Sequence, residues 1–181
     1  MKAFVEAVLE PVRRELTAYL CRLVLRPSVA EELTQTTFLR ALECLENLPT
    51  EPERARAWLF RVATNLAFDE LKRHSTWRET LMDDLREAAE ASPAFVSRSL
   101  ALAASPETKA IAREHVVACF ACVIRNLPPQ RAASLLLREV SGFSNEEIAE
   151  ILGATPVQVK NWLQEGRAAM TARYEATCAL V

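Results

Sequence analysis

Apolar positions recur every three to four residues in several separate stretches of the chain, which is the spacing of amphipathic helices. Over residues 30–44 two helical faces separate: Ala30, Leu33, Thr37, Ala41 and Cys44 share one, and Glu32, Gln35, Thr36, Leu39 and Glu43 share the other. A second helix is predicted over 54–72, with an apolar stripe formed by Trp58, Leu59, Val62, Leu66 and Leu71. Two prolines, Pro49 and Pro52, interrupt the pattern between these segments and predict a loop.

The last third of the chain carries start and stop signals for consecutive helices. A helix over 107–126 is followed by Leu127-Pro128-Pro129, and the next helix runs to Val140 and closes at Gly142. Ser144 and Glu147 have the spacing of a capping box, and Gly153 suits a left-handed helix end. Thr155, Pro156 and Gln158 predict the start of one more helix, with Val159 and Leu163 facing inward. This arrangement predicts either a helix-turn-helix or a plain helical hairpin with no role in DNA binding.

Composition supports a wholly helical protein. The chain has 181 residues, of which half are hydrophobic and only 3 are glycine, so glycine-rich phosphate loops and tight β-turns are disfavoured. Residues 76–106 mix acidic and small side chains without a sustained apolar face. We therefore predict an all-α fold in which two small helical domains, residues 1–75 and 107–181, are joined by a flexible linker over 76–106.

Net charge and hydropathy narrow the class of protein further. The formal net charge is −2, whereas a protein that binds DNA unaided is usually basic. A DNA-binding protein that a larger partner carries to its site remains compatible with this charge. The chain has no apolar run long enough to span a membrane and no signal sequence, so we expect a cytoplasmic protein without membrane insertion.

Three segments, in this order, carry a family resemblance. Ala30–Ala41 resembles region 2.2, and Ala57–Arg73 resembles the region 2.3/2.4 helix, of the extracytoplasmic-function (ECF) sigma factors of bacterial RNA polymerase. Leu127–Arg131 and the following helix-turn-helix resemble region 4 of the same family. The resemblance implies a sigma factor of the sigma-70 superfamily, which has no enzymatic chemistry and directs core polymerase to −10 and −35 promoter elements. It also implies an anti-sigma partner.

The resemblance assigns roles to three groups of residues. Core polymerase is expected on the face formed by Glu32, Gln35, Thr36 and Leu39. The −10 DNA is expected at Arg54, Arg56, Arg61, Asn65, Lys72 and Arg73, where extraction of a base requires a shaped pocket and nearby cations. The −35 duplex is expected at Thr155, Gln158, Lys160, Asn161, Gln164 and Arg167, side chains suited to base edges and phosphates. Trp58 is expected in the core, because it falls on the apolar stripe.

The chain departs from the family pattern at several positions. Many relatives carry glutamate in place of Thr36, arginine in place of Thr64, and basic residues in place of Trp162 and Glu165. The last two changes lower the positive charge of the recognition helix. They predict weak binding of promoter DNA without polymerase, or packing of Trp162 against another surface.

A cysteine and histidine cluster offers a different chemistry. His115, Cys119 and Cys122 fall on one helical face, and Cys178 supplies a conceivable fourth ligand for zinc. Buried apolar positions are the favoured explanation of the same residues, and no cofactor is then required. The alternative function is a polymerase-independent helix-turn-helix regulator, with or without a zinc or thiol sensing site at this cluster.

Overall fold

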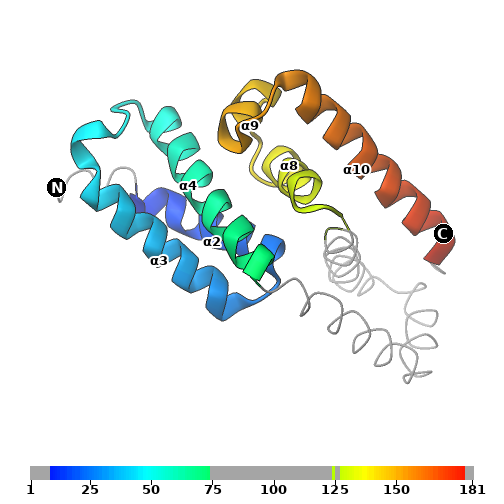
Figure 1. Cartoon of the computed structure of the whole chain (residues 1–181), viewed down its shortest axis with the longest axis horizontal. Coiled ribbons are helices and arrows are strands. Elements are labelled where there is room, and N and C mark those ends of the chain that lie inside the picture. The colour runs from blue at the N-terminus through cyan, green and yellow to red at the C-terminus, as the bar shows by residue number, and fades with distance from the viewer. Residues whose placement is uncertain (1–8, 74–123, 125–126, 178–181) are drawn as a thin grey trace, which may run out of the picture.

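The computed structural model describes residues 9–73, 124 and 127–177, and within them every regular element is a helix (Figure 1). The predicted all-α fold is therefore confirmed. The helices are α2 (Glu10–Val24), α3 (Pro27–Glu43), a short 3-10 turn (Leu45–Asn47), α4 (Pro52–Arg73), α8 (Pro129–Glu139), α9 (Asn145–Leu152) and α10 (Pro156–Thr177). The predicted linker and nearly all of the helix predicted over 107–126 lie outside the described residues.

Helices α2, α3 and α4 pack against one another as an N-terminal bundle. Four of the residues predicted to share one helical face, Ala30, Leu33, Thr37 and Ala41, lie on the inner face of α3 and are buried. The prediction that Cys44 shares this face is wrong, because Cys44 is exposed. The helix ends one residue earlier, and the backbone of Cys44 has already left the helical conformation.

The buried face of α4 differs from the predicted stripe. Leu59 is buried as expected, but Trp58, Val62, Leu66 and Leu71 are only half-buried. The inner positions are Ala55, Leu59, Phe60, Ala63, Thr64 and Ala67. Helix α4 is contacted by α2 and α3 and also by helices of the C-terminal half. Because its backbone must approach several neighbours closely, small side chains are favoured at most of these positions.

One buried polar pair joins α2 to α4. The Tyr19 hydroxyl lies 2.8 Å from Thr64 Oγ1, which itself donates to the Phe60 carbonyl at 2.6 Å. Because Thr64 uses its proton on that carbonyl, Tyr19 is the donor within the pair. Burial raises the pKa of the Tyr19 phenol well above its ordinary value.

Helices α8, α9 and α10 form a C-terminal module. Both predicted capping boxes are confirmed: Glu147 N–H donates to Ser144 Oγ at 3.2 Å, and Gln158 N–H donates to Thr155 Oγ1 at 3.2 Å. Gly153 adopts the predicted left-handed conformation, with φ of 62°, and turns the chain from α9 into α10. Val159 and Leu163 face inward as predicted.

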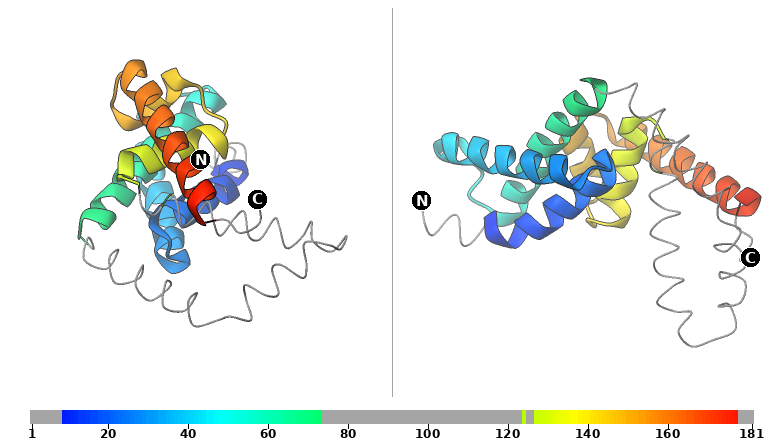
Figure 2. Two further views of the ribbon diagram at one scale, coloured as in Figure 1. Left: turned by 90° about the vertical axis from the view of Figure 1, so that its right-hand side faces the viewer. Right: turned by 90° about the horizontal axis from the view of Figure 1, so that it is seen from below.

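The two halves are in contact. Helix α9 packs against α4, and α8 packs against α2, whereas α10 packs against α8 and α9 (Figures 1 and 2). The Phe60 ring of α4 meets the Phe143 ring, which precedes α9, edge-on at 4.9 Å between centroids. One hydrophobic core therefore runs through both halves of the described chain. Among the described helices, none is both long and apolar enough to cross a membrane.

The buried phenol generates a prediction about pH. A group whose pKa is raised by folding stabilises the fold below its unfolded pKa, about 10 for tyrosine, and loses that contribution as the pH rises further. Tyr19→Phe should lower the free energy of unfolding by about 1 kcal/mol at neutral pH. It should also reduce the loss of stability above pH 10, as measured by urea unfolding followed by circular dichroism. An unchanged alkaline loss in this variant would exclude the Tyr19 phenol as its source.

A second prediction concerns the crossing of α8 and α10. A Cβ atom at Gly166 would lie 2.6 Å from Leu135 Cδ1 and 2.9 Å from Leu135 Cγ, and Leu135 is fully buried. Alanine normally stabilises a helix interior by about 1 kcal/mol over glycine. Gly166→Ala should instead destabilise this protein by about 1–3 kcal/mol in urea unfolding, because the buried Leu135 side chain would have to shift within a packed core. The cost should shrink in a Leu135→Ala background, and a stabilising Gly166→Ala would contradict this packing.

Candidate nucleic-acid and protein interfaces

The outer face of α3 is a neutral and acidic surface with one large apolar side chain. Glu32, Gln35 and Leu39 are exposed, and 60 % of Leu39 is open to solvent. Thr36 is half-buried, and its hydroxyl donates to the Glu32 carbonyl at 2.9 Å. The structure therefore brings these four residues together on one face.

Five of the six predicted −10 residues of α4 divide into two groups. Arg54 and Arg61 line a cavity of about 310 Å³ together with Trp58, and the opposite wall is formed by Glu150 and Ile151 of α9. Trp58 is thus half-buried against the core and also lines this cavity. Arg54 forms an exposed ion pair with Glu51 within its own helical turn at 3.5 Å. The other group, Asn65, Lys72 and Arg73, is exposed further along α4.

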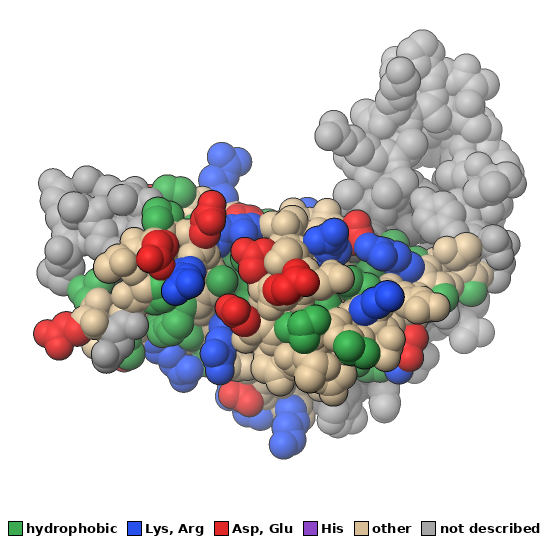
Figure 3. All heavy atoms as spheres, turned by 90° about the horizontal axis from the view of Figure 1, so that it is seen from above, with side chains coloured by type: hydrophobic (Ala, Val, Ile, Leu, Met, Phe, Trp, Pro, Cys, Tyr) green, Lys and Arg blue, Asp and Glu red, His purple; other side chains and the backbone are tan. Residues whose placement is uncertain are grey.

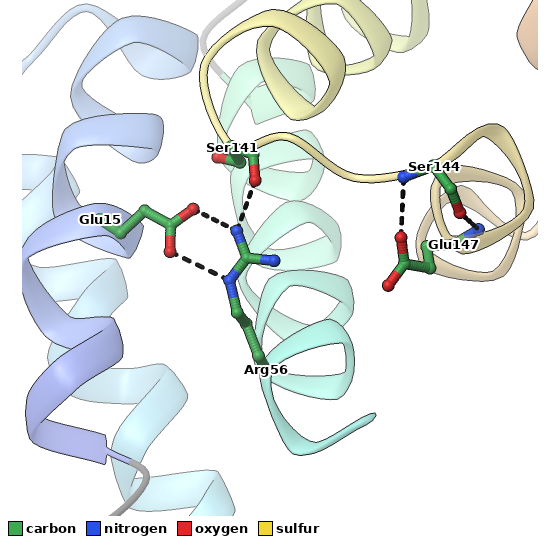
Figure 4. A network of polar contacts seen from close by, with 5 residues as sticks. All are labelled: Glu15, Arg56, Ser141, Ser144 and Glu147. Atoms are coloured by element: carbon green, nitrogen blue, oxygen red, sulfur yellow. Dashed lines mark hydrogen bonds and ion pairs between the residues drawn. The ribbon is translucent and has the colours of Figure 1, made fainter. Parts of the chain in front are cut away.

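Arg56 lies apart from both groups. Its guanidinium makes a two-pronged contact with the Glu15 carboxylate, with Nε 3.0 Å from Oε2, and also donates to the Ser141 carbonyl (Figure 4). The same guanidinium carbon lies 3.9 Å from the centre of the Phe143 ring. Its Nε and Nη2 donors are therefore occupied by protein groups from α2 and from the segment between α8 and α9.

The exposed face of α10 is also partly occupied. Thr155 and Gln158 cap the first turn of α10, where Gln158 Oε1 accepts a hydrogen bond from the Thr155 backbone amide at 2.9 Å. Arg167 is paired with Glu139 of α8 at 2.6 Å. Lys160, Asn161 and Gln164 are exposed and make no hydrogen bond or ion pair within the described residues. These three side chains are free to meet a ligand.

Sequence reasoning missed several residues beside these positions. A hollow of about 430 Å³ lies between α8, α9 and α10, and Arg138, Asn145 and Lys160 are among its lining residues. Val157, in the first turn of α10, has 67 % of its side chain exposed. The signal for Val157 was its place at the start of the second helix of a helix-turn-helix, whose first residues contact base edges in proteins of this class. Arg138 gave no such local signal, since it reaches the hollow only through the packing of α8.

The proposed zinc ligands His115, Cys119, Cys122 and Cys178 all lie outside the described residues. Within the described part of the chain, no three His, Cys, Asp or Glu side chains are grouped closely enough to hold a metal ion.

The Sigma-70 region 2 model matches residues 8–76, and the Sigma-70 region 4 model matches residues 118–170, so together they match more than half of the chain. The ECF RNA polymerase sigma factor SigG of Mycobacterium tuberculosis is 33% identical over 170 residues, which cover 87% of this chain and 45% of that protein. The chain belongs to the ECF group of the sigma-70 family. It spans less than half the length of SigG.

Other relatives extend the match over nearly the whole chain. RNA polymerase sigma factor SigZ of Bacillus subtilis is 25% identical over 174 residues, which cover 96% of this chain and 89% of that protein. A solved structure, the sigma factor RpoE in complex with the anti-sigma factor NepR from Bartonella quintana, has a TM-score of 0.67 and 17% identity, and covers 98% of this chain and 99% of RpoE. That structure is similar in fold.

The departures from the ECF pattern have physical explanations in the structure. Thr64 is buried, and its hydroxyl is hydrogen-bonded to Tyr19. A charged arginine at this buried position would be destabilising. Trp162 is half-buried and packs against the core, which agrees with the expectation that it packs against another surface. The carboxylate of Glu165 is paired with Arg131 at 2.6 Å. Both substitutions in α10 thus give side chains that contact the protein itself, Trp162 through the core and Glu165 through Arg131 of α8.

Charges of both signs are interspersed over the face of this sigma factor drawn in Figure 3. Neither sign covers that face alone. This distribution agrees with the net charge of −2 and differs from the continuous basic surface of a protein that binds DNA unaided.

Proposed function

We propose that this chain is an alternative sigma factor that binds bacterial core RNA polymerase and directs it to promoters through their −10 and −35 elements. The observation that supports this most is the order of a region 2 bundle and a region 4 helix-turn-helix in one chain. We propose the domain bounds 1–75 and 107–181, with a linker over 76–106. The protein then performs no covalent chemistry, acts in the cytoplasm, and is inhibited by an anti-sigma factor.

The α3 face, Glu32, Gln35, Thr36 and Leu39, is proposed to bind polymerase. On α4, the exposed cations and Asn65 would contact the separated −10 strand, whose phosphates need positive partners and whose bases need stacking or hydrogen bonds. The cavity beside Trp58 has the cations expected around an extracted base. Arg61, Asn65 and Lys72 are the best placed, because they make no hydrogen bond or ion pair within the described residues.

On α10, Lys160, Asn161 and Gln164 are proposed to contact the −35 duplex. Asn161 and Gln164 suit adenine, and Lys160 suits guanine or phosphate. Thr155 and Gln158 would act mainly by holding the first turn of the helix, whose backbone amides can meet a phosphate. Val157 would add an apolar contact with a thymine methyl group.

The first test is polymerase binding and run-off transcription with purified core enzyme. Leu39→Ala should weaken binding to core polymerase about tenfold, because the buried area of one leucine is lost from the interface. Val140→Ala, which shortens another exposed apolar side chain outside the proposed face, is the matched control and should bind normally. Failure of the unmodified chain to bind core enzyme, with nanomolar binding of promoter duplex alone, would instead support the polymerase-independent regulator.

The second test concerns the −35 element, after its sequence has been mapped from transcription start sites. Replacing each −35 thymine by deoxyuridine removes only the 5-methyl group. One such replacement should reduce open-complex formation severalfold with the unmodified chain and have little effect with Val157→Ala, since both changes remove the same contact. Additive losses at every thymine would exclude Val157 as the residue in contact with a methyl group.

A further inference from the structure

Glu165 lies on the exposed face of α10, in line with two residues proposed above to contact the −35 duplex. Val157, Asn161 and Glu165 follow one another at a spacing of four residues, and all three are exposed. Residues at this spacing form one row along a helix. Val159 and Leu163 are buried on the opposite face. The exposed row therefore ends at an acidic side chain, about two turns after Val157.

The length of this row matches a few base pairs of duplex. A helix rises about 1.5 Å per residue, so the distance along α10 from Val157 to Glu165 is about 12 Å. Base pairs are stacked about 3.4 Å apart, so the row covers about three to four of them. The first residues of the second helix contact base edges in helix-turn-helix proteins. With Val157 and Asn161 on base edges, Glu165 faces the same groove.

An unpaired carboxylate in this row would oppose DNA binding, because phosphates border the groove on both sides. Glu165 is paired, since Arg131 Nε of α8 lies 2.6 Å from Glu165 Oε2. The two side chains are 39% and 51% exposed, so the pair stays open to a ligand. The ion pair neutralises the carboxylate and fixes its position. A carboxylate has about four lone-pair sites on its two oxygens, so it can accept further hydrogen bonds.

Cytosine is the base whose major-groove edge fits such an acceptor. Cytosine and adenine both present an amino group in the major groove, but adenine also presents the acceptor N7 beside it. A carboxylate would be repelled by that nitrogen, whereas cytosine presents its N4 amino group without an adjacent acceptor. Asn161 and Gln164 carry both a donor and an acceptor, so they suit adenine instead.

We propose that Glu165, positioned by Arg131, accepts a hydrogen bond from the N4 amino group of a cytosine in the −35 element. The chain then selects a C·G pair at one position of that element. This inference rests on the proposed function and adds a base preference to it. A basic side chain at this position would instead donate to guanine. Arg131 acts only through Glu165, by holding the carboxylate in place.

Open-complex formation with core polymerase tests the base preference, once the −35 element has been mapped from transcription start sites. Replacing one cytosine at a time by 2-pyrimidinone, on either strand, removes only the 4-amino group. One such replacement should lower open-complex formation about tenfold with the unmodified chain, the loss expected for one specific base contact. The same replacement should have little effect with Glu165→Ala, since both changes remove the same hydrogen bond.

Glu139→Ala is the matched control, because Glu139 forms another ion pair between α8 and α10, with Arg167 at the same distance of 2.6 Å. This variant should keep the full loss at the same cytosine. Arg131→Ala should shrink that loss, whereas a purely structural role of Arg131 would leave the ratio between the two DNAs unchanged. Circular dichroism should show all three variants folded, because exposed ion pairs contribute little to stability.

Two results would overturn the inference while leaving the proposed function intact. In the first, Glu165→Ala and the unmodified chain suffer equal losses at every cytosine. In the second, the unmodified chain transcribes from the promoter, and no replacement of a −35 cytosine reduces open-complex formation. Failure of the unmodified chain to start transcription with core enzyme would refute the proposed function itself, and the inference with it.

Discussion

The packing of the two halves centres on Arg56 of α4, which is held by the Glu15 carboxylate within its own bundle and, from the other half, by the Ser141 carbonyl and the Phe143 ring. A guanidinium suits this place because its planar donors bind the Glu15 carboxylate with two prongs while its face stacks on Phe143. A lysine would supply the charge without the second prong or the stacking. This contact adjoins the packing of α9 against α4, where Arg54 and Arg61 line a cavity together with Glu150 and Ile151.

Local sequence was sufficient wherever the partners lie within one helical turn. Both capping boxes and the left-handed Gly153 were predictable, because the atoms involved are three or four residues apart. The exposed and buried faces of α3 followed from helical spacing for the same reason. The error at Cys44 shows the limit of this reasoning, since the periodicity of side chains does not indicate the residue at which the helix ends.

Tertiary packing decided what local sequence could not. The predicted stripe of α4 favoured its largest apolar side chains, yet alanines occupy half of the inner positions, because several helices pack closely against α4. Arg56 looked like any other cation of the proposed −10 set, and its partners at Glu15, Ser141 and Phe143 have no periodic relation to it. Gln158 and Arg167 were predicted correctly as exposed, but their pairing with Thr155 and Glu139 leaves fewer free donors than their number suggests.

These pairings show why few of the cations proposed to contact DNA are available for it. Of the cations assigned to DNA, Arg54, Arg56, Arg73 and Arg167 are matched by acidic side chains of the same chain. Arg61, Lys72 and Lys160 have no acidic partner among the described residues. Because each phosphate contact contributes to affinity by releasing counterions, three free cations on two separate faces provide little unaided binding. Affinity must then come from a partner that places both faces on DNA together, as a sigma factor on its polymerase requires.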